Sequence, residues 1–289
     1  MVEVEPVLTV QNEVGECPIW HPDENALYWV DNESTCFFRF DPKTGAHEKI
    51  DIGIGIGVIA LRQMGGLLIA THRGLETWDF NTRSLTLIAN AEADKPMRRF
   101  NDGAVDRVGR FWVGTMGDAN NNGLYCLEDD HTVHQVDAGF DISNGIGWSP
   151  DGRTMYFTDS TPAIIYAYDF DLLRGTIANR RIFVDSSDRR GVPDGLTVDL
   201  DGFVWSARWD GACIDRYDPD GRLERTIPLP VRCPTSAAFG GDELRDLYIT
   251  SARYELTPEQ RKKPSADGDL FRLRFDEDIR GIPAASFAG

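Results

Sequence analysis

Four short segments of the sequence carry oxygen-bearing side chains beside glycine or proline, where the backbone must turn. They read VGECPIW at 14–20, RRFNDG at 98–103, ISNGIGW at 142–148 and VPDGL at 192–196. Two carboxylates, Glu16 and Asp194, and two amides, Asn101 and Asn144, form an all-oxygen set that suits a hard divalent cation such as Ca²⁺, Mg²⁺ or Mn²⁺. An isolated Asn-Asp-Gly or Pro-Asp-Gly is more often a plain β-turn, so the hypothesis requires a fold that brings the four segments together.

Other common catalytic and cofactor motifs are absent from the sequence. The segment around Ser149 lacks the Gly-x-Ser-x-Gly pattern of an α/β-hydrolase nucleophile, and the five histidines form no His-Glu-x-x-His. The run GIGIG at 53–57 has the wrong spacing for a dinucleotide-binding loop. The five cysteines are scattered and form no Cys-x-x-Cys, which argues against a zinc knuckle and favours a reducing, cytoplasmic compartment.

One pattern recurs six times along the chain: a polar turn followed by a short strand with a large apolar residue near its centre. The central residues are Trp29, Leu68, Trp112, Tyr156, Trp205 and Tyr248, at separations of 39, 44, 44, 49 and 43 residues. A second short strand follows each copy and often ends in Asp and a turn. Helical periodicity is nearly absent, apart from a short helix predicted at 257–263.

Six units of roughly 44 residues, each made of several short strands, are typical of an all-β, six-bladed β-propeller. We expect one domain spanning residues 1–289. A solenoid has the same period, but a closed ring removes exposed end repeats. The N-terminal strand at 6–10 resembles the last strand of a blade, so we expect it to complete the final blade and close the ring. The four polar segments then occupy comparable places on different blades and converge at one end of a central channel.

The net charge of the chain argues against some classes of binding partner. Asp and Glu number 47 and Lys and Arg 30, for a formal net charge of −17. A surface of this sign repels phosphate backbones, which argues against nucleic acid and anionic membranes as partners. No apolar run approaches the roughly 18 residues that a membrane span needs, and residues 1–10 do not resemble a signal peptide. We expect a monomer, because no long exposed apolar run is visible.

The polar segments also resemble those of one known family. GECPIW at 15–20, RFNDG at 99–103, SNG at 143–145 with WS at 148–149, PDG at 193–195 and TSAR at 250–253 occur in this order in the senescence marker protein/gluconolactonase family, which includes regucalcin and bacterial sugar lactonases. The resemblance runs from about Val7 to Leu273. It implies a six-bladed propeller that binds one divalent cation in its channel and hydrolyses aldonolactones.

Residue by residue, the resemblance implies a division of roles. Glu16, Asn144 and Asp194 match the family's metal ligands. Asn101 is similar to a residue that lies near both metal and substrate, and Arg99 to one that holds sugar hydroxyls. Asp194 also matches the carboxylate proposed as general base, with a metal-bound hydroxide as the competing account. The cation would act as a Lewis acid on the lactone carbonyl.

The sequence departs from the family's pattern in one loop. Family members often have a longer loop here, with an acidic residue that contacts substrate, whereas this chain has only GDANNN at 117–122. Asp118 is our candidate for that contact, and the neighbouring asparagines are the alternatives.

The resulting functional prediction is metal-dependent hydrolysis of a small sugar lactone to the aldonic acid. Two other readings stay open: a propeller hydrolase of other esters or organophosphates, and a non-enzymatic calcium-binding propeller. The sequence leaves the lactone unspecified, and also the metal, which could be calcium, magnesium, manganese, zinc or iron.

Overall fold

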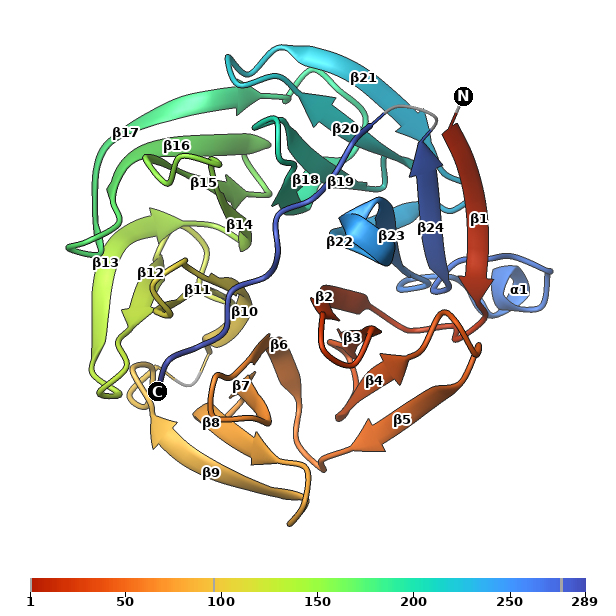
Figure 1. The fold of residues 1–289 in the computed structure, drawn as a ribbon. Coiled ribbons are helices and arrows are strands. Elements are labelled where there is room, and N and C mark those ends of the chain that lie inside the picture. The colour runs from red at the N-terminus through yellow and green to blue at the C-terminus, as the bar shows by residue number, and fades with distance from the viewer. Residues whose placement is uncertain (1, 96, 276–277) are drawn as a thin grey trace.

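Six four-stranded antiparallel sheets stand around a common axis like the blades of a propeller (Figure 1). The computed structural model of the protein describes residues 2–95, 97–275 and 278–289. Over these residues the regular structure comprises 24 strands, one 3₁₀ helix and one turn of α-helix. The six-bladed β-propeller predicted from the repeat pattern is therefore confirmed.

Each blade is a simple meander whose first strand lies nearest the axis (Figure 1). Blade 1 contains β2 (Gly15–His21), β3 (Ala26–Asp31), β4 (Cys36–Phe40) and β5 (His47–Asp51). Blade 2 contains β6 (Ile56–Leu61), β7 (Leu67–Thr71), β8 (Gly74–Asp79) and β9 (Ser84–Ala89). Blade 3 contains β10 (Arg99–Val105), β11 (Phe111–Met116), β12 (Asn122–Leu127) and β13 (Val133–Phe140).

The second half of the ring repeats this arrangement. Blade 4 contains β14 (Ser143–Trp148), β15 (Thr154–Asp159), β16 (Ile164–Asp171) and β17 (Thr176–Asp185). Blade 5 contains β18 (Val192–Val198), β19 (Val204–Trp209), β20 (Cys213–Tyr217) and β21 (Leu223–Pro228). Blade 6 contains β22 (Cys233–Gly240), β23 (Asp246–Ala252), β24 (Leu270–Phe275) and, from the other end of the chain, β1 (Val2–Leu8); the 3₁₀ helix η1 (Asp242–Leu244) lies between β22 and β23.

The N-terminal strand closes the ring, as predicted, by pairing antiparallel with β24. Its limits differ from the predicted 6–10, since β1 runs from Val2 to Leu8. The strand ends there because the backbone N–H groups of Val10 and Gln11 donate to Asp269 Oδ1, at 3.0 and 3.1 Å, and so leave the ladder.

In blades 3 and 5 the repeated polar turn and the tryptophan after it form one hydrogen-bonded unit. The Asp106 carboxylate accepts from the backbone N–H of Val108 at 3.0 Å and from Trp112 Nε1 at 3.0 Å. Asp199 likewise accepts from Trp205 Nε1 at 3.0 Å. All six central residues identified in the sequence lie on the second strand of a blade and are buried. The sequence period therefore reflects a turn followed by a buried strand that recurs near the second strand of every blade.

The predicted short helix is present but is only one turn long. α1 (Pro258–Arg261) lies between β23 and β24, and Thr257 caps it through a reciprocal pair of hydrogen bonds with Gln260. Pro258 occupies the first turn, where its missing N–H costs nothing. Within the described part of the chain, no helix has both the length and the apolarity needed to cross a bilayer.

The C-terminal segment 279–289, here named the strap, crosses one end of the ring (Figure 1). Its first part bonds to blades 5 and 6, where the Leu200 N–H donates to Arg280 O at 2.8 Å. Its last part bonds to blades 2 and 3 through Phe287, which exchanges hydrogen bonds with Leu61 and Gln63, and through Ala288. Phe287 is fully buried among blade residues. The strap therefore ties together blades that are far apart around the ring.

Deletion of residues 2–8 should strongly destabilise the protein, because it removes the pairing that joins the two chain ends and exposes the edge of β24. We expect the melting temperature to fall by about 10 °C or more, since each kcal/mol is worth roughly 2–4 °C in a chain of this size. Calorimetry would measure the change. Leu173→Ala, at a side chain that is 88% exposed, is the matched control and should change little. A deletion variant as stable as the full chain would contradict this view of ring closure.

Candidate metal centre and active site

A β-bulge in the innermost strand of each blade determines which side chains reach the axis. The pairing of first and second strands shifts register between Glu16 and Ile19 in β2, Phe100 and Gly103 in β10, Ser143 and Ile146 in β14, and Pro193 and Leu196 in β18. A bulge bends the strand and re-aims its side chains, and such bulges often occur beside active sites. Asn101, Asn144 and Asp194 are the first residues of their bulges, and Glu16 is the last paired residue before its own. Asn101, Asn144 and Asp194 therefore occupy matching places on three blades, and Glu16 lies one position earlier on its own blade.

Three buried carboxylates interact at this level of the ring. Glu16, Asp102 and Asp194 are each less than 7% exposed. No described Lys, Arg or His lies within ion-pair distance of any of them. Burial first, and then repulsion from Asp194 and Asp102, raises the pKa of Glu16 well above its ordinary value. Burial and the charge of Asp102 raise the pKa of Asp194 in the same way. Buried acids without a cation are costly, so this arrangement favours a bound positive charge.

The hydrogen bonding of the Asn144 side chain indicates whether a metal ion fits the site. Its Nδ2 donates to Ser160 Oγ at 3.0 Å, which leaves Oδ1 as an acceptor. This oxygen is buried and has no hydrogen-bond partner among the described residues. A buried acceptor without a donor costs about 1–3 kcal/mol, and a coordinated cation removes that cost. The described residues contain no group of three or more His, Cys, Asp or Glu side chains placed to hold a metal, so the amide oxygen is needed to complete the set.

Arg99 and Asn101 form a linked pair beside these acids. Arg99 Nη1 donates to Asn101 Oδ1 at 3.0 Å, and Asn101 Nδ2 donates to the carbonyl of Ser143 at 2.9 Å. Ser143 directly precedes Asn144, so these bonds connect the predicted substrate-binding residues of blade 3 to a predicted metal ligand of blade 4. Burial lowers the pKa of Arg99, against the opposing charges of Glu33 and Glu16.

Asp118 lies in a different environment from the other predicted residues. Its carboxylate pairs with Arg98 Nη2 at 3.3 Å and accepts from Asn121 Nδ2 at 2.8 Å. The structure therefore ties it to its own loop and to Arg98, and brings it into no contact with Arg99 or Asn101. Its role in substrate binding stays a prediction.

Asp102 is a site residue that the sequence reasoning did not select. It is the second residue of its bulge, where blades 4 and 5 have Gly145 and Gly195. Its carboxylate accepts from the Gly103 N–H at 2.7 Å, and burial raises its pKa to about 6. The signal was available: an acid replaces glycine in a segment already chosen for Asn101.

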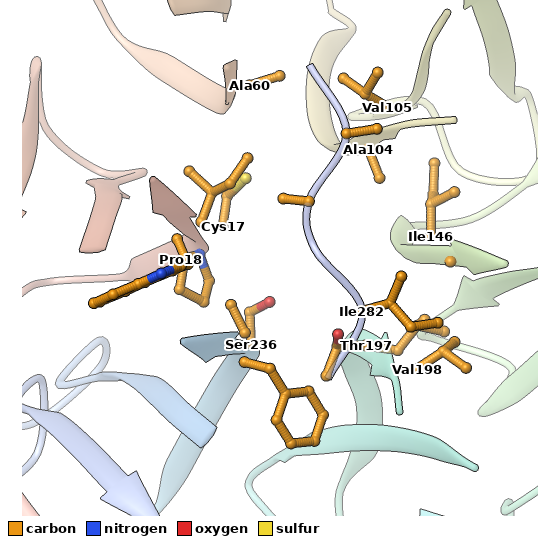
Figure 2. Close-up of a pocket in the computed structure, with 18 of the residues that line it drawn as sticks. Cys17, Pro18, Ala60, Ala104, Val105, Ile146, Thr197, Val198, Ser236 and Ile282 are labelled. Atoms are coloured by element: carbon orange, nitrogen blue, oxygen red, sulfur yellow. The ribbon is translucent and has the colours of Figure 1, made fainter. Parts of the chain in front are cut away.

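A cavity of about 180 Å³ lies on the axis next to this site (Figure 2). Asp102, Cys17 and Ser236 are among its lining residues, and most of the others are apolar side chains of the first strands. Residues 282–285 of the strap line it as well, as the tube that crosses Figure 2 shows. Cys17, like the other four cysteines, is a free and buried thiol.

The strap and the predicted site residues lie at opposite ends of the ring. The strap bonds to turns that join the first and second strands of blades, such as those at 62–66 and 106–110. Glu16, Asn144 and Asp194 lie instead near the beginnings of first strands, towards the opposite end. The predicted site therefore faces away from the strap.

Comparison with known proteins identifies the family of the chain. Residues 14–253 match the family described as the SMP-30/Gluconolactonase/LRE-like region. The chain belongs to this family. The matched region contains all the predicted site residues and ends at the last of the motifs noted in the sequence.

Relatives of the chain within the family cover nearly its whole length. A pentonolactonase of Haloferax volcanii is 39% identical over 278 residues, which cover 95% of this chain and 94% of that protein. A regucalcin of Xenopus laevis is 33% identical over 297 residues, covering 100% of this chain and 99% of the relative. The crystal structure of a regucalcin from Agrobacterium tumefaciens, described as a calcium-binding protein, has a TM-score of 0.91 at 28% identity and covers 97% of this chain and 96% of its own.

The raised pKa of Asp102 predicts a pH-dependent stability cost in the metal-free protein. Its folded pKa of about 6 lies above its ordinary 3.8. Asp102 therefore lowers the free energy of unfolding by nothing below about pH 3.8. Its destabilising effect grows as the pH rises from 3.8 to about 6 and is complete above that pH. Asp102→Asn should stabilise the EDTA-treated protein by about 2–3 kcal/mol at pH 8 and by almost nothing at pH 4.

Urea denaturation at the two pH values would measure this difference. Asp188→Asn, at an exposed position, is the matched control and should change neither value. An Asp102→Asn variant less stable than the wild type at pH 8 would contradict the electrostatic account of the three acids.

Proposed function

We propose that this protein is a divalent-metal-dependent lactonase that hydrolyses a sugar lactone to the corresponding aldonic acid. The observation that carries the proposal is the buried set of Glu16, Asp194 and the unpartnered Asn144 Oδ1, next to the linked pair of Arg99 and Asn101. The name of the Haloferax relative, a pentonolactonase 39% identical to this chain, supports a lactone as substrate. Five-carbon lactones are therefore the first substrates to test.

Glu16, Asn144 and Asp194 are the residues that would hold the cation. When bound, a divalent cation polarises a lactone carbonyl and stabilises the negative charge that develops on its oxygen. The carboxylates of Glu16 and Asp194 balance the charge of the ion, and the neutral amide of Asn144 adds an oxygen ligand without adding negative charge. The name of the Agrobacterium structure, a calcium-binding protein, puts Ca²⁺ among the ions to test.

Asp194 is the proposed general base. A carboxylate has two oxygens, so one can bind the cation while the other accepts a proton from the attacking water. Asp194 is buried at the site, so the oxygen that the cation leaves free lies where it can take a proton from the attacking water. The water oxygen bonds to the carbonyl carbon, the ring C–O bond breaks, and the proton passes from Asp194 to the released alkoxide.

Arg99 and Asn101 are proposed to orient the ring hydroxyls of the lactone. Their mutual hydrogen bond and the bond from Asn101 to Ser143 O keep both side chains in place before substrate arrives. Correct placement of the carbonyl over the site lowers the barrier by proximity. The strap lines the opposite side of the axial cavity, so we infer that substrate approaches from the end of the ring where Arg99 lies.

A panel of lactones tests the proposal. EDTA-treated protein receives single additions of calcium, magnesium, manganese, zinc or iron. Hydrolysis of xylono-, arabinono-, glucono- and galactonolactone is then followed with a pH indicator. We expect metal-restored turnover, faster on the five-carbon lactones. Calcium binding without turnover would favour a non-enzymatic calcium-binding propeller. Turnover confined to an aryl ester or a phosphotriester would point to another kind of propeller hydrolase.

Asp194→Asn should lower kcat by about 10²- to 10⁴-fold, because it removes the proton acceptor and one charge of the metal site. Steady-state kinetics at saturating metal would measure the loss. Asp185→Asn, an exposed acid at the end of β17, is the control and should keep full activity. Substantial turnover by Asp194→Asn would remove this residue from the role of base.

Arg99→Ala should act mainly on KM, with an increase of about 10- to 100-fold, because hydrogen bonds from a charged group to substrate are lost. The value of kcat should change far less. Michaelis–Menten analysis on the best lactone would separate the two parameters. An unchanged KM would exclude Arg99 from substrate binding.

A further inference from the structure

The guanidinium of Arg99 is held on one side by neutral acceptors from two different blades. Its Nη1 donates to Asn101 Oδ1 on its own strand and, also at 3.0 Å, to Asn32 Oδ1 in the turn between β3 and β4 of blade 1. A third, longer bond of 3.4 Å runs from Nη1 to the carbonyl of Phe100. Every hydrogen bond that the structure gives Arg99's side chain therefore uses Nη1.

The other edge of the guanidinium is left for a ligand. No described residue accepts a hydrogen bond from Arg99 Nε or Nη2, and no described carboxylate lies within ion-pair distance. Two other arginines that are at most 9% exposed at the side chain show the contrast: Arg110 pairs with Asp106 at 2.8 Å and Arg216 with Asp199 at 2.6 Å. The Nε and Nη2 donors of arginine lie side by side and suit two oxygen acceptors at once.

Asn32 is itself rigidly placed. It is 7% exposed, and its backbone N–H donates to Val14 O at 2.8 Å. The preceding residue, Asp31, accepts from the N–H groups of Glu13 and Val14 at 3.1 and 3.0 Å. The turn that carries Asn32 is thus fixed to the segment that leads into Glu16.

An amide in this place has a consequence that a carboxylate would not have. The Asn32 oxygen fixes the position of Nη1 without neutralising the guanidinium. Arg99 therefore keeps its positive charge for a ligand, although it is partly buried. Glu33 and Glu16 act on it only from beyond ion-pair distance.

We propose that Asn32 is a positioning residue, which holds Arg99 so that its Nε and Nη2 donors face two adjacent hydroxyl oxygens of a polyhydroxylated lactone. This inference rests on the proposed function. Asn32 acts through Arg99 and touches no reacting atom.

A set of variants tests the proposal on the lactone that the wild type hydrolyses best. Asn32→Ala should raise KM about tenfold and leave kcat within about twofold, because Arg99 loses its cross-blade acceptor. Asn32→Asp keeps an acceptor oxygen for Nη1 but adds a charge that pairs with the guanidinium, so its KM should lie between those of Asn32→Ala and the wild type. In an Arg99→Ala background, Asn32→Ala should have no further effect on KM.

Thr35→Ala is the matched control. Thr35 lies in the same turn as Asn32, but its hydroxyl donates to Asp51 and not to Arg99. The KM of this variant should therefore equal that of the wild type. Thermal unfolding of each variant identifies a change in stability. An Asn32→Ala variant with unchanged KM, or one whose effect adds fully to that of Arg99→Ala, would overturn the inference while leaving the lactonase proposal intact. A wild type that hydrolyses no lactone with any metal would overturn both.

Discussion

The pairing of β1 with β24 is the contact on which the geometry of this protein depends. It joins strands from opposite ends of the chain and turns six consecutive meanders into a ring. Only in a closed ring do the first strands of all blades face one axis. The strap reinforces this closure by bonding to blades 5 and 6 with its first part and to blades 2 and 3 with its last part. A site assembled from blades 1, 3, 4 and 5 therefore has its geometry set by contacts that lie far from it.

The same ring creates an electrostatic conflict at its axis. Glu16, Asp102 and Asp194 lie buried together, and burial and mutual repulsion raise the pKa values of Glu16 and Asp194. Asn144 adds a buried oxygen without a donor. Each of these features lowers the stability of the protein without a cation, and a divalent cation would reverse each of them. Features that weaken the fold at one point while the rest of the chain is well paired are typical of functional sites.

The polar contacts around Arg99 show how several blades share a site. Asn32 comes from blade 1, Arg99 and Asn101 from blade 3, and the carbonyl that holds Asn101 from blade 4. The acceptors around Arg99 are neutral, so its charge stays available, whereas Arg110 and Arg216 in the blades are neutralised by acids. The difference separates an arginine that can bind a ligand from arginines that stabilise turns.

The sequence by itself determined the architecture, because the repeat has a local cause. A polar turn and a large buried residue recur within a few residues of each other in every blade, and in blades 3 and 5 a hydrogen bond joins them, as it joins Asp106 and Trp112, so the period is visible without tertiary information. It also predicted which segments form the candidate site, because bulge residues such as Asn144 and Asp194 stand beside glycines at one phase of the repeat. Only the tertiary structure decided the rest. The pairing of Asp118 with Arg98 depends on how a loop folds back within blade 3. The proximity of Asp102 to Glu16 and Asp194 and the bond from Asn32 to Arg99 depend on how different blades face one another across the ring. Contacts between residues this far apart in the chain leave no periodic trace in the sequence, since they arise from the closure of the ring and the direction of each bulge.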